Sequence, residues 1–152
     1  MIDIDLNEII SNFEKTMGLS LEFSEDNMAE VIFNKDIAIG IKCIDEDGTI
    51  TLSSVISDDL PDPMSKDLLQ EILKINSVPV FTYGGNNPVI ARDPNTGFIF
   101  VYEIITSSVL QVENLFNIFS DFVRSALVLR EYITSNSTQN KELQNINTMI
   151  EA

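Results

Sequence analysis

The sequence has no histidine, no tryptophan and a single cysteine, Cys43. The absence of histidine excludes the Ser-His-Asp and Cys-His arrangements of nucleophilic catalysis. One cysteine without histidine cannot supply the usual zinc ligand sets, and it cannot form a disulfide within the chain. The stability of the fold therefore has to come from a hydrophobic core, and the chain has few of the side chains on which catalysis usually depends.

Basic residues are scarce as well. The 152 residues include 9 Lys and Arg against 24 Asp and Glu, which gives a formal net charge of −15. This charge opposes binding to nucleic acid and to anionic membranes, because both require clusters of Lys and Arg. No apolar run reaches the length of about 18 residues that predicts a membrane span, and no basic leader precedes an apolar stretch. We expect a cytoplasmic protein whose partners include no nucleic acid and no membrane.

Hydrophobic residues make up 44% of the chain, an ordinary share for a globular protein. Apolar residues at helical spacing predict a first helix over residues 3–17, which Gly18 would end. A second helix is predicted to begin near Asp62-Pro63. A third should begin near Ser108, where a capping box stands, and should reach about Tyr132.

The segments between these helices alternate between apolar and polar residues, as strands do. Their connections are too short for parallel crossovers, so the strands should be antiparallel. The last of them is apolar on both faces apart from Glu103, which predicts a central strand covered on both sides. The predicted fold class is α+β, with one twisted antiparallel sheet packed with helices in the order helix–strands–helix–strands–helix. The predicted strands are 19–23, 28–33, 37–44, 49–56, 88–92 and 98–105.

The end of the chain differs in composition from the rest. Residues 134–152 are rich in Ser, Thr, Asn and Gln and contain no aromatic residue. We therefore divide the chain into a domain of residues 1–133 and a polar, flexible C-terminal tail of residues 134–152, which could also be a weakly held extra helix.

A metal site and carboxylate catalysis are the two kinds of chemistry that the acidic residues suggest, and each has a simpler interpretation. The loop Asp45–Gly48 suggests a calcium site, but Cys43 and Ser54 would stand where an EF-hand loop has Asp and Glu, so a hairpin turn is favoured. Carboxylate pairs such as Asp58-Asp59 could serve an enzyme that uses carboxylates alone. With 24 acidic residues such pairs arise by chance. We predict no enzymatic activity, no catalytic residue, no metal site and no cofactor, and we expect Cys43 to be a buried structural residue.

Several short strings occur in a characteristic order along the chain. A Gly-Leu-Ser-Leu string follows the first helix, and the second helix reads Leu-Leu-x-x-Ile-Leu-x-x-Asn. A Gly-Gly pair, an Asp-Pro-Asn-Thr-Gly turn and a helix with two Phe residues and a Val-Arg pair come next. In order and spacing these strings resemble the class I type III secretion chaperones of bacterial pathogens, the family that includes CesT. They stand at Gly18–Leu21, Leu68–Asn76, Gly84-Gly85, Asp93–Gly97 and Phe119–Arg124.

The resemblance implies a bacterial, cytoplasmic homodimer without enzymatic activity. Each dimer would bind the N-terminal segment of one or a few secreted effector proteins in extended form, keep it soluble and present it to the secretion ATPase. The alternative is a non-enzymatic regulatory or small-ligand-binding domain of the same architecture.

The residues themselves indicate how such a client could be held. An extended segment is bound by strand addition at a sheet edge and by apolar pockets. The predicted pocket residues are Leu21, Phe23, Val31 and Phe33, although each could instead be plain core. The second helix is apolar around much of its circumference, which suits a two-fold dimer interface, and its expected contributors are Leu68, Leu69, Ile72 and Leu73. The acidic surface would keep the dimer soluble and could steer basic clients.

Overall fold

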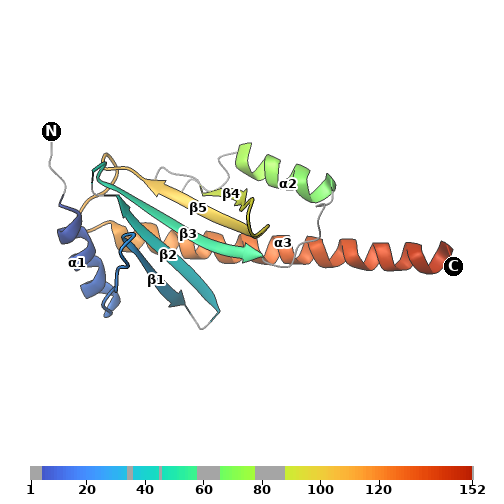
Figure 1. Cartoon of the computed structure of the whole chain (residues 1–152), viewed down its shortest axis with the longest axis horizontal. Helices are drawn as coiled ribbons and strands as arrows, with labels where there is room; N and C mark the ends of the chain where they lie inside the picture. The colour runs from blue at the N-terminus through green and yellow to red at the C-terminus, as the bar shows by residue number, and fades with distance from the viewer. Residues whose placement is uncertain (1–4, 34–35, 45, 58–65, 78–87, 152) are drawn as a thin grey trace.

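The described part of the chain forms a five-stranded antiparallel sheet and three helices (Figure 1). The computed structural model describes residues 5–33, 36–44, 46–57, 66–77 and 88–151, with the backbone alone for residues 77 and 136–151. The strands lie in the order β1-β2-β3-β5-β4, and every pairing is antiparallel, which confirms the predicted α+β fold. The elements are α1 (Leu6–Met17), β1 (Met28–Phe33), β2 (Ile37–Ile44), β3 (Thr49–Ser57), α2 (Lys66–Ser77), β4 (Val89–Arg92), β5 (Ile99–Ile105) and α3 (Leu115–Glu151).

Both ends of α1 are set by local hydrogen bonds. The Asp5 carboxylate accepts from the Asn7 N–H at 2.9 Å, so Asp5 is the N-cap and the helix begins at Leu6. Gly18 ends the helix in the left-handed conformation at φ 70°, as predicted. The apolar face between these two caps is buried, and its residues are Leu6, Ile9, Ile10 and Phe13.

The hydrophobic core lies between one face of the sheet and the helices α1 and α3. Figure 1 shows α3 running behind the sheet, with α1 beside its first part. The two helices meet where the rings of Phe13 and Phe119 pack edge to face, with centroids 5.1 Å apart. From the sheet, β2 contributes every second residue, as the alternation predicted, and these buried residues are Ile37, Ile39, Ile41 and Cys43.

Residues 19–23, predicted as a strand, pair with no strand. The Leu21 N–H donates instead to Glu14 Oε2 at 3.0 Å, which ties this segment to α1. The prediction was wrong because alternation shows two faces of a segment, whereas pairing depends on which backbone groups lie opposite it.

The third helix begins later and ends later than predicted. Its start is at Leu115 rather than near Ser108, because the Asn114 side chain holds a preceding turn: it accepts from the Gln111 N–H at 2.9 Å and donates to the Val109 carbonyl at 2.7 Å. The helical backbone continues past Tyr132 to Glu151. The flexibility of residues 134–152 and the division of the chain at residue 133 stay predictions.

Strand β5 is central, as predicted, since it lies between β3 and β4. Within the described residues it is covered on one face only. Ile99, Val101, Glu103 and Ile105 are buried on the face toward α3, whereas Ile104 on the other face is exposed. The predicted cover on both faces was wrong, because the sequence does not show that α1 and α3 lie on the same side of the sheet.

Strand β4 is an edge strand whose backbone is held by α2. The Asn76 side-chain amide donates to the Ile90 carbonyl and accepts from the Ile90 N–H, both at 2.9 Å. This pair of bonds occupies backbone groups that would otherwise form an open sheet edge. The start of α2 predicted at Asp62-Pro63 lies outside the described residues.

Replacing Asn76 with alanine should lower the free energy of unfolding by about 1–2 kcal/mol, because both Ile90 backbone groups lose a hydrogen-bond partner. Urea unfolding monitored by circular dichroism measures the change. Asn76→Asp is the matched control: it keeps an acceptor for the Ile90 N–H and removes the donor, so at neutral pH it cannot satisfy the carbonyl. An alanine variant as stable as the parent would contradict this role of Asn76.

Candidate polypeptide-binding surfaces

The first surface is a cavity of about 360 Å³ between α1 and the segment that follows it. Glu14 positions one wall, since its carboxylate accepts from the Leu21 N–H. The cavity brings together two of the predicted pocket residues, Leu21 and Phe23, and Phe23 is partly open to solvent. An apolar side chain entering here would contact both. The full lining is Leu6, Asn7, Ile10, Ser11, Glu14, Leu21, Phe23, Asn27 and Cys43.

The other two predicted pocket residues lie elsewhere. Val31 is 6% exposed and belongs to the core, because odd-numbered positions of β1 face the helices. The prediction that Val31 lines a surface pocket was therefore wrong. Phe33 lies at the end of β1 and is exposed, so its role in binding stays a prediction.

The edge of β1 is the second candidate surface. Within the described residues, β1 pairs with β2 on one side and with no strand on the other. The open-face side chains Met28 and Ile32 next to this edge are exposed. An edge strand flanked by exposed apolar side chains is suited to strand addition by an extended peptide.

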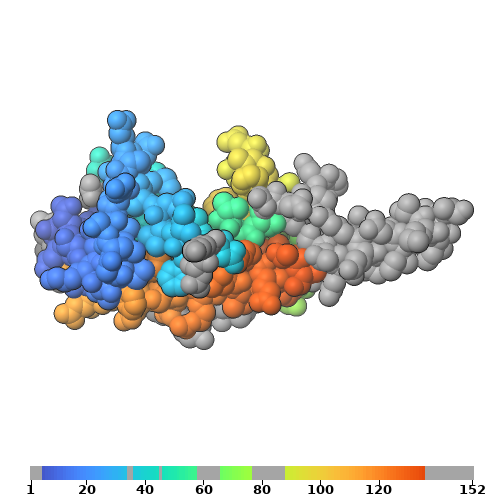
Figure 2. Space-filling view, turned by 90° about the horizontal axis from the view of Figure 1, so that it is seen from below, coloured from blue at the N-terminus to red at the C-terminus, as the bar shows by residue number. Residues whose placement is uncertain are grey.

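The third surface is the face of the sheet that no described helix covers. Figure 2 shows it as a low area between two projections, the blue segment after α1 and the yellow β4–β5 turn. A groove of about 530 Å³ lies on this face. Gly40 and Ser53 are paired in register there, and both are small: a Cβ on Gly40 would stand 2.9 Å from the Ser53 Oγ. The described lining is Met28, Glu30, Asp36, Ala38, Gly40, Ser53, Ser54, Val55, Asp93, Thr96, Phe98 and Phe100.

The sequence pattern did not predict this groove. The residues that form it occupy the other face of each alternating strand: in β1, Met28, Glu30 and Ile32 share the face opposite to Ala29 and Val31. A mixed register of this kind predicts an ordinary solvated face, so nothing in the pattern alone pointed to a groove.

The four residues predicted for a dimer interface divide into two pairs. Leu68 is 3% exposed and Ile72 is 9% exposed, because both pack into the core of the same chain. Leu69 and Leu73 lie one helical turn apart and are 44% and 67% exposed. Only Leu69 and Leu73 are thus available on the surface for a second copy.

Hydrogen bonds fix one carboxylate in each of the β1–β2 and β4–β5 turns, Asp36 and Asp93. Arg130 reaches from α3 to the β1–β2 turn, where its guanidinium contacts both carboxylate oxygens of Asp36, at 2.6 and 3.3 Å. In the other turn the Asp93 carboxylate accepts from the backbone N–H groups of Asn95 and Thr96, and the Asn95 bond is the main cause that lowers the pKa of Asp93. Both carboxylates border the groove in defined positions.

Clustered metal ligands and membrane-spanning helices are both absent from the described residues. In that part of the chain no three His, Cys, Asp or Glu side chains come together as possible metal ligands. No helix there is long and apolar enough to span a membrane.

A cavity that exposes Leu21 and Phe23, a strand edge that pairs with no described strand and an apolar groove on an open sheet face are features of a domain that binds other polypeptides. The comparison with protein families agrees with this class. The chain belongs to the Tir chaperone protein (CesT) family, which it matches over residues 8–130. No curated protein matches the chain.

Solved structures share the fold. A chain of the ExsC–ExsE complex gives a TM-score of 0.67 at 18% identity, covering 84% of this chain and 92% of the other. The HopA1–SchA chaperone–effector complex gives a TM-score of 0.64 at 18% identity, covering 84% of this chain and 98% of the other. The Yersinia pestis type III secretion chaperone SycH, solved with a stable fragment of YscM2, gives 0.62 at 17% identity, covering 82% and 99%.

Proposed function

We propose that this protein is a cytoplasmic type III secretion chaperone that binds the N-terminal segment of one or a few effector proteins and keeps it soluble and competent for secretion. The observation that carries the proposal is the match to the CesT family over residues 8–130. Several structures with the same fold are complexes, such as ExsC with ExsE and SycH with a fragment of YscM2. Delivery of the bound effector to the secretion ATPase completes the proposed role.

The surfaces of the chain support binding of an extended client. The Met28 carbonyl already accepts from the Ser24 N–H at 2.8 Å, so a client strand alongside β1 would form its backbone hydrogen bonds with the edge beyond Met28, at Glu30 and Ile32. Such bonds give affinity without sequence preference. Side chains of such a strand alternate between two faces. Those directed toward α1 could enter the cavity beside Leu21 and Phe23, and those on the other side would meet Met28 and Ile32.

A homodimer through α2 is the second part of the proposal. Leu69 and Leu73 form an exposed apolar pair on a helix whose opposite face is already buried. A two-fold axis would bring this pair against its own copy, which is the self-complementary contact that a symmetric dimer requires. Family membership supports a protein without enzymatic activity, because binding and release of a client need no chemical step.

Co-expression with the N-terminal fragment of a secreted protein encoded by a neighbouring gene tests the function. We expect a stable complex on size exclusion, and light scattering of the chaperone alone should give about twice 17.0 kDa. Phe23→Glu should abolish co-purification of the fragment, whereas Ser20→Glu adds the same charge to the same segment and should not. A monomer that binds no such fragment would overturn the proposal.

The dimer interface is tested separately. The double variant Leu69→Glu/Leu73→Glu should shift the mass to that of a monomer, because four carboxylates would face one another across the two-fold axis. Gln70→Glu, which adds charge to an exposed position of the same helix, should leave the dimer intact. A dimer that survives the double variant would place the interface elsewhere.

A further inference from the structure

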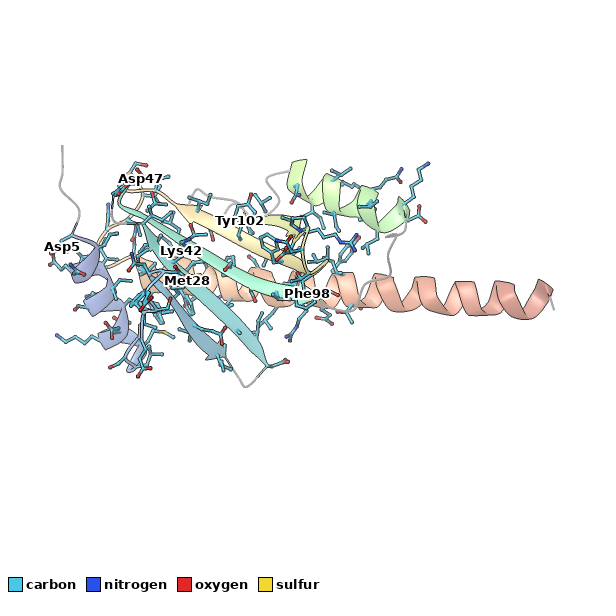
Figure 3. All side chains as sticks on the ribbon, viewed as in Figure 1. Asp5, Met28, Lys42, Asp47, Phe98 and Tyr102 are labelled. Atoms are coloured by element: carbon cyan, nitrogen blue, oxygen red, sulfur yellow. The ribbon has the colours of Figure 1, made fainter. Side chains whose placement is uncertain are left out.

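The groove on the open sheet face combines an apolar lining with acidic borders. Its apolar side chains come from four strands and the β4–β5 turn, and include Met28, Ala38, Val55, Phe98 and Phe100. Three of the described lining residues are acidic, and none is basic. Lys42 lies on the same face next to Met28 (Figure 3), but it does not line the groove.

The three acidic residues differ in whether their carboxylates already have a charged partner. Asp36 is already paired with the Arg130 guanidinium. Glu30 is an exposed residue of β1, and Asp93 lies at the opposite wall, where backbone N–H groups fix its carboxylate. Glu30 and Asp93 are therefore the two groups best placed to receive cations from a ligand.

On this basis, and resting on the proposed chaperone function, we propose that the groove binds a segment of the client in which basic residues are interspersed with apolar ones. The apolar side chains would pack on Met28, Val55 and Phe100, and the basic side chains would pair with Glu30 and Asp93. Charge complementarity selects this occupant: a second copy of the chain carries a net charge of −15 and would be repelled by the acidic borders.

The geometry of the sheet sets the spacing of the basic residues. Glu30, Gly40, Ser53 and Tyr102 lie in register across β1, β2, β3 and β5. Asp93 follows β4, one strand beyond β5 and further along than the Val89 that pairs with Tyr102, so at least four strand spacings of about 4.8 Å, or about 19 Å, separate it from Glu30. An extended chain rises about 3.3 Å per residue, so the two basic residues of a segment crossing the groove should stand at least about six positions apart.

The test uses the whole protein and three fluorescein-labelled twelve-residue peptides. All three share leucine and serine positions, and differ at two positions six residues apart that are both Lys, both Ser or both Glu. We expect the Lys peptide to bind at least ten times more tightly than the Glu peptide by fluorescence anisotropy, with the Ser peptide between them. Raising the salt concentration should reduce this preference. Equal affinities for the three peptides would overturn the proposal.

Variants locate the binding. Glu30→Lys should weaken the affinity for the Lys peptide at least five-fold and Glu30→Gln about two- to three-fold. Glu46→Lys, in the exposed β2–β3 turn, should change this affinity less than two-fold.

A thiol placed in the groove tests the position of the bound peptide. In a protein with Cys43→Ala and Ser53→Cys, the Lys peptide should slow alkylation of the new thiol. If alkylation is not slowed, the peptide binds elsewhere and the proposal fails. The last outcome separates the two proposals. If these variants do not change the affinity for the Lys peptide but an effector fragment still co-purifies, only the basic-segment site is rejected and the chaperone function stands.

Discussion

Replacing Phe13 with alanine is expected to lower the free energy of unfolding by about 3–5 kcal/mol. Phe13 is 1% exposed and its ring packs edge to face on Phe119, so the change removes the main contact between α1 and α3 and leaves a cavity. A loss of this size is a large part of the total stability of a small domain. Because α1 also forms one wall of the cavity beside Leu21 and Phe23, affinity for an effector fragment should fall with it.

The measurement is urea unfolding at a fixed protein concentration, since dimerisation would make the apparent stability depend on concentration. Phe13→Leu is the matched control, because it keeps most of the apolar volume and should cost less than half as much. A double-mutant cycle of Phe13→Leu and Phe119→Leu isolates the contribution of the ring pair, which should be about 1 kcal/mol. An alanine variant with unchanged stability would mean that α1 does not belong to the cooperative core.

Stability is expected to fall as the pH rises from about 4.5 to about 7, in part because of Glu103. Burial on the α3-facing side of β5, and to a lesser extent the charge of Asp121, raise the pKa of Glu103 to about 7. The folded protein therefore keeps a proton that the unfolded chain has already released in this range. The stabilisation that comes from this bound proton is therefore fully present below about pH 4.5 and is lost as the pH rises through about 7.

Glu103→Gln removes this ionisation and keeps the shape of the side chain. The full conversion of this pKa shift is about 3.4 kcal/mol. Because solvent screens part of the effect, we expect the variant to be more stable than the parent by about 2–3 kcal/mol at pH 8 and equal to it at pH 4. Urea unfolding at both pH values gives the comparison. Glu30→Gln, which neutralises an exposed carboxylate on the other face of the same sheet, should show no such pH dependence. If Glu103→Gln gives the same difference at pH 4 and pH 8, the carboxyl is not buried as described.

The sequence predicted most of the elements because local patterns are sufficient for them. The bounds of β1 and β2 follow from period-two alternation between turn residues, and Gly18 ends α1 where the pattern places a stop. The elements that were misjudged depend on distant groups. Residues 19–23 alternate like a strand, yet Glu14 holds their backbone, and the true start of α3 depends on the three-dimensional turn around Asn114.

The candidate site shows the same division more sharply. Composition alone gave an acidic chain without histidine, and short strings in order gave the resemblance to secretion chaperones that the family match confirms. Which apolar residues reach the surface was decided by tertiary structure. Leu68 and Leu69 are neighbours of the same type, yet one is 3% and the other 44% exposed. A periodic pattern tells which residues share a face, but not which face another element will cover. That choice came from α1 and α3 packing on the same side of the sheet, which buried Val31 and left the groove of Met28, Val55 and Phe100 open.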